Sequence, residues 1–111
     1  MPYTLNGQPA TIDQEPLDQD GTVYVPLKHV VEALGGSVTW DNTTKTASAK
    51  VATWNAVFKL GDENIDVNGT QVQFTAPPLD EDGQVWVPAQ FFHNAYGYKV
   101  EATGANVSIG L

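Results

Sequence analysis

The chain has 111 residues, of which 41% are hydrophobic and 16% are charged, as is typical of one folded globular domain. Thirteen acidic residues stand against five basic ones, all lysines, and the net charge of −8 excludes nucleic acid and anionic membranes as expected partners. The absence of cysteine excludes disulfides and thiol-ligated metal sites.

Two copies of a β-hairpin are predicted, one at the start of the chain and one beyond its middle. Asn6-Gly7 and Asn68-Gly69 each separate two alternating segments. Asn-Gly is typical of a two-residue hairpin turn, because both of its residues accept positive φ. Such a turn gives each hairpin one apolar face, on which the expected opposite pairs are Tyr3 with Ala10 and Ile65 with Val72.

Each hairpin is followed by a short strand and then a helix. The strands are expected at residues 23–25 and 85–87, after an acidic turn that ends in glycine. Pro26 and Pro88 are then expected to open the two helices, because the first helical position needs no backbone N–H. At helical spacing, the first helix is expected to bury Leu27, Val30, Val31 and Leu34 and to expose Lys28, His29 and Glu32.

Glycines and alternating residues define the remaining elements. Gly35 and Gly97 are expected to end the two helices in the left-handed conformation. Strands are predicted at residues 37–40 and 46–51, with a turn at 41–43 between them. Alternation indicates two further strands, whose apolar residues are Trp54, Ala56, Phe58 and Leu60 in the first and Val107, Ile109 and Leu111 in the last.

The chain repeats itself with an offset of 62 residues. Residues 6–38 and 68–100 align without a gap and are identical at 13 of 33 positions, which we interpret as the duplication of one unit. The predicted fold class is therefore α+β, with antiparallel β strands packed on two short helices and a pseudo-twofold internal repeat. Residues 1–111 are expected to form a single domain made of two repeats, at about 1–54 and 55–111.

Residues 23–41 read Val-Tyr-Val-Pro-Leu-Lys-His-Val-Val-Glu-Ala-Leu-Gly-Gly-Ser-Val-Thr-Trp-Asp, after the Asn-Gly and acidic-Gly turns. This pattern resembles the copper amine oxidase N-terminal-like domain, also called the stalk domain, and the resemblance covers essentially the whole chain. It implies a non-catalytic paired unit of secreted and surface proteins of bacteria. The chain departs from the family where Lys28 and Gln90 replace a frequent arginine, and where Ala102-Thr103 matches Trp40-Asp41.

No catalytic or metal-binding constellation is predicted. His29 is expected on the outer face of its helix, and His93 at a core-facing position with a hydrogen bond inside the fold. A metal shared by these two histidines would lack two or three further ligands. Residues 18–21 and 80–83 resemble the start of a calcium loop, but Asp and Gly are also good turn formers, and we favour turns. We therefore expect no enzyme, no metal and no cofactor.

Aromatic and terminal residues are the candidates for interaction. An exposed patch is considered for Trp86, Phe91 and Tyr98, and also for Trp54, for which a core position is favoured. The terminal strands are candidates for pairing with neighbouring copies by strand addition. The predicted interaction residues are Tyr3, Leu5, Trp86, Phe91, Tyr98, Val107 and Ile109.

The predicted function is a non-catalytic structural or stalk module of a bacterial surface or secreted assembly, which assembles into a fibre or layer through edge-strand pairing. The alternative is a module that binds cell-wall polysaccharide through exposed aromatic side chains; neighbouring Asn and Gln would favour sugar, and a flat apolar edge would favour protein. Expected partners are copies of the chain, neighbouring surface domains or a cell-wall glycan, without nucleic acid or membrane insertion. The expected location is extracellular or at the cell surface, and no signal peptide is expected within the chain.

Overall fold

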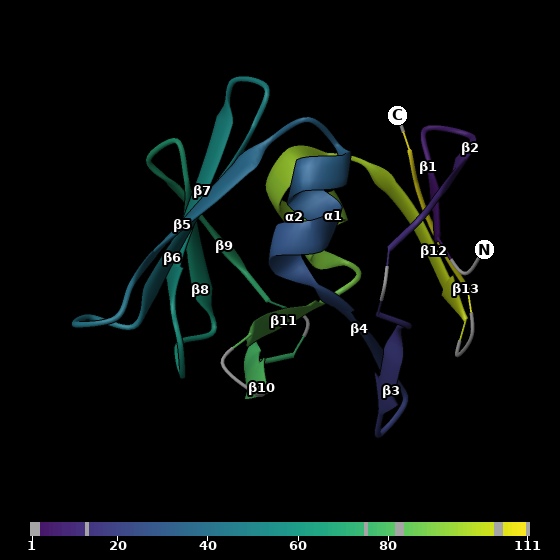
Figure 1. Ribbon diagram of the computed structural model, residues 1–111. Coiled ribbons are helices and arrows are strands. Elements are labelled where there is room, and N and C mark those ends of the chain that lie inside the picture. The colour runs from purple at the N-terminus through teal and green to yellow at the C-terminus, as the bar shows by residue number, and fades with distance from the viewer. Residues whose placement is uncertain (1–2, 13, 75, 82–83, 104–105, 111) are drawn as a thin grey trace.

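The computed structural model describes residues 3–12, 14–74, 76–81, 84–103 and 106–110. Two short helices, α1 (Leu27–Ala33) and α2 (Phe91–Tyr96), lie at the centre of the molecule (Figure 1). The strands are β1 (Tyr3–Leu5), β2 (Gln8–Ala10), β3 (Leu17–Gln19), β4 (Thr22–Pro26), β5 (Ser37–Asp41), β6 (Thr46–Val51), β7 (Trp54–Lys59), β8 (Asn64–Val67), β9 (Thr70–Gln73), β10 (Leu79–Glu81), β11 (Gln84–Pro88), β12 (Lys99–Thr103) and β13 (Asn106–Gly110).

The strands form three sheets around the helices. Their strand orders are β12-β13-β1-β2, β10-β11-β4-β3 and β5-β6-β7-β8-β9. Figure 1 shows the five-stranded sheet on one side of α1 and α2 and the sheet that contains β1 and β13 on the other. The expected antiparallel sheets with two short helices are confirmed, but β1 and β13 pair in parallel, which the sequence did not indicate.

Both halves of the chain contribute to every sheet. The N-terminal hairpin adds to the last two strands, and the second hairpin adds to the strands that follow α1. Buried apolar residues from both halves also form one hydrophobic core. The two halves therefore share all three sheets and one core.

The two Asn-Gly turns form as predicted. Asn6 and Gly7 have φ of 52° and 81°, and Asn68 and Gly69 have φ of 49° and 90°. The register also agrees, because Tyr3 pairs with Ala10 and Ile65 pairs with Val72. A third two-residue turn, at residues 20–21, joins β3 to β4, and neither β3 nor β10 was expected as a strand. Residues 82–83 and Leu111, which belong to predicted elements, lie outside the described residues.

The prolines were expected to open the helices, and this prediction is wrong in detail. Pro26 and Pro88 are the last residues of β4 and β11, and Pro26 has an extended ψ of 116°. α1 still follows Pro26 directly, but α2 begins only after Gln90. The Ala89 N–H donates to the Val23 carbonyl at 2.8 Å, which keeps this part of the chain on β4.

Glycine ends both helices as expected. Gly35 has φ of 89°, and the Gly36 N–H donates to the Val31 carbonyl at 2.8 Å, the hydrogen bond of a Schellman cap. Gly97 ends α2 with φ of 79°. The predicted faces of α1 are confirmed as well. Of the four residues expected to be buried, Leu27, Val30 and Val31 are buried and Leu34, just after the helix, is half-buried; Lys28, His29 and Glu32 are exposed.

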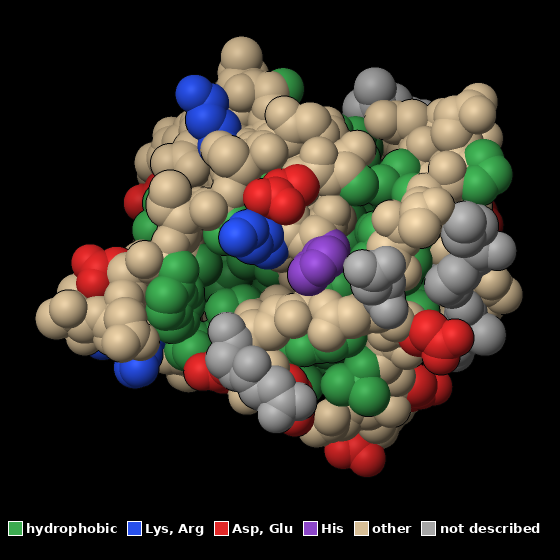
Figure 2. Space-filling view, viewed as in Figure 1, with side chains coloured by type: hydrophobic (Ala, Val, Ile, Leu, Met, Phe, Trp, Pro, Cys, Tyr) green, Lys and Arg blue, Asp and Glu red, His purple; other side chains and the backbone are tan. Residues whose placement is uncertain are grey.

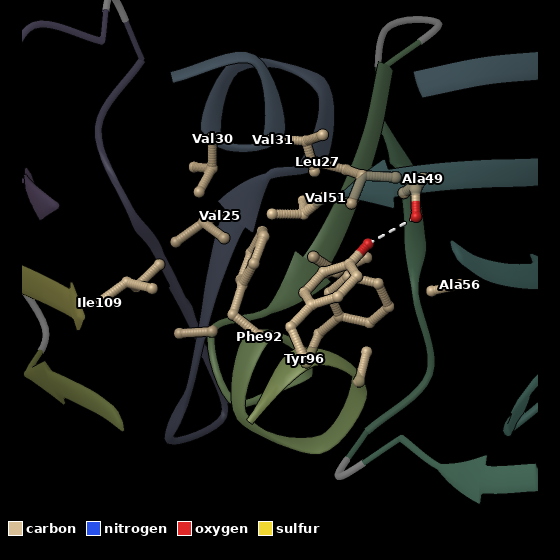
Figure 3. Close-up of a cluster of buried hydrophobic side chains, with 14 of the residues drawn as sticks. Val25, Leu27, Val30, Val31, Ala49, Val51, Ala56, Phe92, Tyr96 and Ile109 are labelled. Atoms are coloured by element: carbon tan, nitrogen blue, oxygen red, sulfur yellow. Dashed lines mark hydrogen bonds between the residues drawn. The ribbon is translucent and has the colours of Figure 1, made fainter. Parts of the chain in front are cut away.

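The core lies between the helices and the sheets, as Figure 3 shows for Val30 and Val31 of α1 and Phe92 of α2. Tyr96 reaches from α2 to β6, where its Oη donates to the Ala49 carbonyl at 2.7 Å. Phe91 is fully buried in an aromatic cluster, with ring centroids 5.2 to 5.6 Å from those of Phe58, Phe74, Phe92 and Tyr96.

Candidate functional site

The structure buries all seven predicted interaction residues. In the terminal strands, Tyr3 and Leu5 of β1 lie beside Val107 and Ile109 of β13 in the interior of their sheet. The edges of that sheet are β12 and β2. The expectation that β1 and β13 are open to a neighbouring copy is therefore wrong, because each of them already has a strand on both sides.

The predicted exposed aromatic patch is also wrong. Phe91 is fully buried, and Trp86 and Tyr98 are each only 8% exposed. Trp54 was expected in the core, yet it is 47% exposed; it is the first residue of β7 and lines a hollow beside Gly97, where α2 ends. Among the described residues, the exposed large hydrophobic side chains are Trp54 and Trp40, which is 39% exposed.

Trp40 lines the groove that we consider the candidate site, and we call it the Trp40 groove. It has a volume of about 300 Å³ and lies where α1, the β5–β6 hairpin and the β10–β11 hairpin meet. In Figure 2, hydrophobic surface lines a hollow beside α1, with Lys and Asp or Glu side chains around it. The apolar part consists of Leu27, Val38, Ala47 and Val85, and the polar part of Lys28, Asn42, Asp80 and Gln84.

Local sequence places Trp40 in this groove. Val38 and Trp40 are two residues apart on β5 and so point to the same face of the strand. Asp41 then closes the hairpin, because its Oδ1 accepts hydrogen bonds from the N–H groups of Thr43 at 2.9 Å and Thr44 at 3.3 Å. The Trp-Asp pair thus combines an exposed indole with a side chain that fixes the adjacent turn.

Polar groups around the groove are partly fixed by neighbours. The Lys45 ammonium donates to Asn42 Oδ1 at 3.0 Å, which leaves the Asn42 Nδ2 group to donate elsewhere. The Gln84 amide donates to Gln14 Oε1. The groove therefore presents amide, carboxylate and ammonium groups beside an indole, and its lining residues include no nucleophile activated by a base.

A second exposed indole, that of Trp54, lies on the same face of the five-stranded sheet as Trp40 but lines a different hollow. Trp54 lines a hollow of about 410 Å³ together with Asn68, Thr70 and Asn94. The Asn68 amide is engaged with the backbone: its Oδ1 accepts from the Asn55 N–H at 2.9 Å and its Nδ2 donates to the Thr53 carbonyl at 3.0 Å. Asn68 thus ties the β8–β9 turn to the start of β7, and its side-chain amide has a structural role.

The histidines and acidic turns take ordinary structural positions. His29 is exposed on α1 as predicted. His93 makes the predicted hydrogen bond inside the fold, with Nδ1 2.8 Å from the Tyr98 carbonyl oxygen, but it lies on the exposed side of α2 rather than facing the core. Asp18 Oδ1 accepts from the Gly21 N–H at 3.2 Å, as in a turn.

Neither a metal-binding cluster nor a membrane-spanning helix occurs in the described part of the chain. No three His, Cys, Asp or Glu residues in it gather closely enough to hold a metal ion. Within the same residues, no helix has the length and apolar character to cross a bilayer.

The reason that sequence analysis missed the Trp40 groove is that its lining comes from three distant segments of the chain. One signal was present, since the second repeat has Ala102 where the first has Trp40. A large aromatic residue that the duplicated unit does not need is a candidate for function.

The chain is similar to a known protein and matches a family model over almost its whole length. A protein of Brevibacillus choshinensis named "Protease inhibitor" is 29% identical over 111 residues, which cover 98% of this chain and 33% of that protein. The chain thus spans about a third of the length of this relative. The family model described as copper amine oxidase N-terminal domain matches residues 4–111, and this type of domain is non-catalytic. The chain therefore belongs to the copper amine oxidase N-terminal domain family.

Proposed function

We propose that this chain is a structural module, a stalk or spacer in a secreted or surface-attached bacterial protein, and that it transmits mechanical load along its own chain without catalysing a reaction. The observation that carries the proposal is the parallel pairing of β1 with β13. Tyr3, Thr4 and Leu5 lie opposite Val107, Ser108 and Ile109, and the Asn6 N–H donates to the Ile109 carbonyl at 2.8 Å.

This pairing sets how a pulling force reaches the fold. In a parallel pair the chain enters β1 at one end of the sheet and leaves β13 at the opposite end, as the N and C labels in Figure 1 show. A pull on both ends then loads the hydrogen bonds between β1 and β13 in shear, so that several must break together. In an antiparallel hairpin pulled at its open end, the hydrogen bonds break one after another.

Burial of their side chains makes β1 and β13 harder to pull apart. Tyr3 and Ile109 are fully buried and Val107 is 2% exposed, so sliding one strand past the other moves side chains out of the core. Forced unfolding depends on the unfolding rate, and such a loss of packing raises the barrier to unfolding. The family assignment supports a module of this kind, since the domain is non-catalytic. Self-assembly through the terminal strands is not part of the proposal, because those strands are occupied.

We also infer that the two repeats are related by a pseudo-twofold axis. The support is the register of β4 and β11, the strands that join the two units: Val25 lies opposite Val87, its counterpart 62 residues later. The flanking pairs are Trp86 with Pro26 and Pro88 with Tyr24, which exchange under the same offset. A second measure of symmetry is the bounds of β3, β4 and β5, which recur with this offset in β10, β11 and β12.

Single-molecule force spectroscopy tests the load-bearing role. The chain has no cysteine, so pairs of engineered cysteines define the pulling points without interference. We expect a several-fold higher unfolding force when the chain is pulled by its two ends than when it is pulled between Ser37→Cys and Lys50→Cys. These two exposed residues pair at the open end of the β5–β6 hairpin and provide the matched unzipping control. An end-to-end force no higher than that of the control would overturn the proposal.

A further inference from the structure

The Trp40 groove has a counterpart elsewhere in the fold. A smaller hollow of about 160 Å³, which we call the Ala102 hollow, lies between β4, the start of α2 and β12. Five of its lining residues are the counterparts, at an offset of 62 residues, of residues in the Trp40 groove. The pairs are Leu27 with Ala89, Lys28 with Gln90, Trp40 with Ala102, Gln84 with Thr22 and Val85 with Val23.

Comparing the Trp40 groove with the Ala102 hollow indicates which of the lining residues the fold itself requires. The Val85 and Val23 positions keep the same residue, whereas tryptophan, leucine and lysine of one groove are replaced by smaller or uncharged residues in the other. Because β12 forms with Ala102 where β5 has Trp40, and with the same bounds at the same offset, packing does not demand an indole at this position. Trp40 is nevertheless 39% exposed, and a fold that needs no indole there gains nothing from exposing one.

The groups around Trp40 define the chemistry of a ligand. An exposed indole face stacks on the C–H face of a pyranose ring, while the amides of Asn42 and Gln84 and the charged groups of Lys28 and Asp80 suit its hydroxyls as donors and acceptors. One lysine and one aspartate leave the rim without net charge, which favours a neutral ligand. The net charge of −8 on the chain further disfavours anionic polymers.

We propose that the Trp40 groove binds a neutral glycan, with one or two pyranose units seated against the indole. The volume of about 300 Å³ is at the small end of the range for ligand sites, which fits one or two rings rather than a long oligosaccharide. The groove lies away from the β1–β13 pair, so glycan binding and load bearing can fail independently. The module would thus attach to a glycan at one site while it transmits load through its terminal strands.

An extended peptide is the competing occupant, because β5 is an edge strand of its sheet. A peptide added to β5 would be held by backbone hydrogen bonds along the strand. It would not depend on Lys28 and Asp80, which come from α1 and β10. The convergence of these two side chains with Trp40 therefore favours the glycan.

Binding is tested by calorimetry and tryptophan fluorescence with two probes, a hexamer of β-1,4-linked N-acetylglucosamine and cellohexaose. We expect at least one probe to bind, and Trp40→Ala to weaken it about tenfold or more, as for an aromatic hot spot. Trp54→Ala is the matched control, because its indole is even more exposed, and it should bind as the wild type does. Trp40→Ala should fold normally, since it copies the alanine of the other repeat, and circular dichroism checks this.

A variant that gains a binding site complements this test, because misfolding can abolish binding but cannot create it. Ala102→Trp combined with Gln90→Lys should convert the Ala102 hollow into a second site and raise the stoichiometry towards two. Failure of both hexasaccharides to bind the wild type at millimolar concentration would overturn the proposal, and so would loss of binding in Trp54→Ala alone. Binding of an extended Thr-Val decapeptide that survives Lys28→Ala and Asp80→Ala would assign the groove to strand addition instead.

Discussion

At the scale of single residues, two buried tyrosines differ in what their hydroxyls contact. Tyr96 Oη donates to the Ala49 carbonyl at 2.7 Å, whereas the buried Tyr3 Oη has no hydrogen-bond partner among the described residues. A buried hydroxyl contributes to stability only when it is paired, and it costs free energy when it is not.

Phenylalanine substitutions should therefore have opposite effects at these two sites. We expect Tyr96→Phe to lower the free energy of unfolding by about 1 kcal/mol, because the Ala49 carbonyl loses its donor. Tyr3→Phe should leave the free energy of unfolding unchanged or raise it slightly. Urea unfolding followed by circular dichroism measures both, and an equal loss in the two variants would contradict the assignment.

Gly36 lies so close to the backbone of β6 that no side chain fits at this position. A Cβ at this position would lie 2.1 Å from the Lys50 carbonyl oxygen, a backbone atom of β6. Gly36→Ala must therefore push the end of α1 away from β6, and we expect it to lower the free energy of unfolding by about 2 kcal/mol or more.

Gly110→Ala is the matched control for this substitution. Its Cβ would meet its nearest neighbour at 3.6 Å, an ordinary contact, so the thermal midpoint should change little. A thermal midpoint that falls as far in Gly110→Ala as in Gly36→Ala would show that the β6 contact is not the cause.

At the scale of elements, the later start of α2 decides which of its residues are buried. The hydrogen bond from Ala89 to β4 delays the helix, and Phe91 then turns into the aromatic cluster. His29, its counterpart on α1, is exposed. Equivalent positions of the two repeats thus have opposite environments.

Alanine substitutions at these two counterpart positions should differ in their effect on the free energy of unfolding. We expect Phe91→Ala to cost about 3–5 kcal/mol, the usual loss for a large aromatic residue in a core. His29→Ala should change the free energy of unfolding by less than about 0.5 kcal/mol, as is usual at the surface. Denaturant midpoints of the two variants check this, and similar midpoints would contradict the opposite environments of the two positions.

At the scale of the whole molecule, buried tyrosines couple stability to high pH. Burial raises the pKa of Tyr96, of Tyr3 and, to a smaller extent, of Tyr24; for Tyr3 the charge of Glu15 adds to the effect. Above about pH 10 the unfolded chain releases these phenolic protons while the folded chain keeps them. The folded state then binds more protons than the unfolded state, so the free energy of unfolding must fall as the pH rises.

We therefore expect full tyrosine-linked stability below about pH 10 and a progressive loss above it. Tyr96→Phe should make this alkaline loss shallower, because one of the coupled groups is gone. Urea titrations at a series of pH values between neutral and strongly alkaline measure the slope. An unchanged slope in Tyr96→Phe would show that its hydroxyl does not titrate differently in the two states.

Local residue patterns were sufficient to predict the parts of the fold that depend on near neighbours. Asn6-Gly7 set both the first turn and its register, because a two-residue hairpin turn needs positive φ at both residues, which Asn and Gly accept. The buried face of α1 followed from helical spacing, and the family followed from the motif at residues 23–41.

Which distant segments meet depends on how the whole chain packs. The parallel partner of β1 is more than 100 residues away in the chain, and no local pattern distinguishes that pairing from an open terminal strand. The same holds for the Trp40 groove, which needs α1, β5 and β11 side by side. Exposure of Trp54 and burial of Phe91 were likewise set by where α2 begins and ends, because a side chain is buried only where another element covers it.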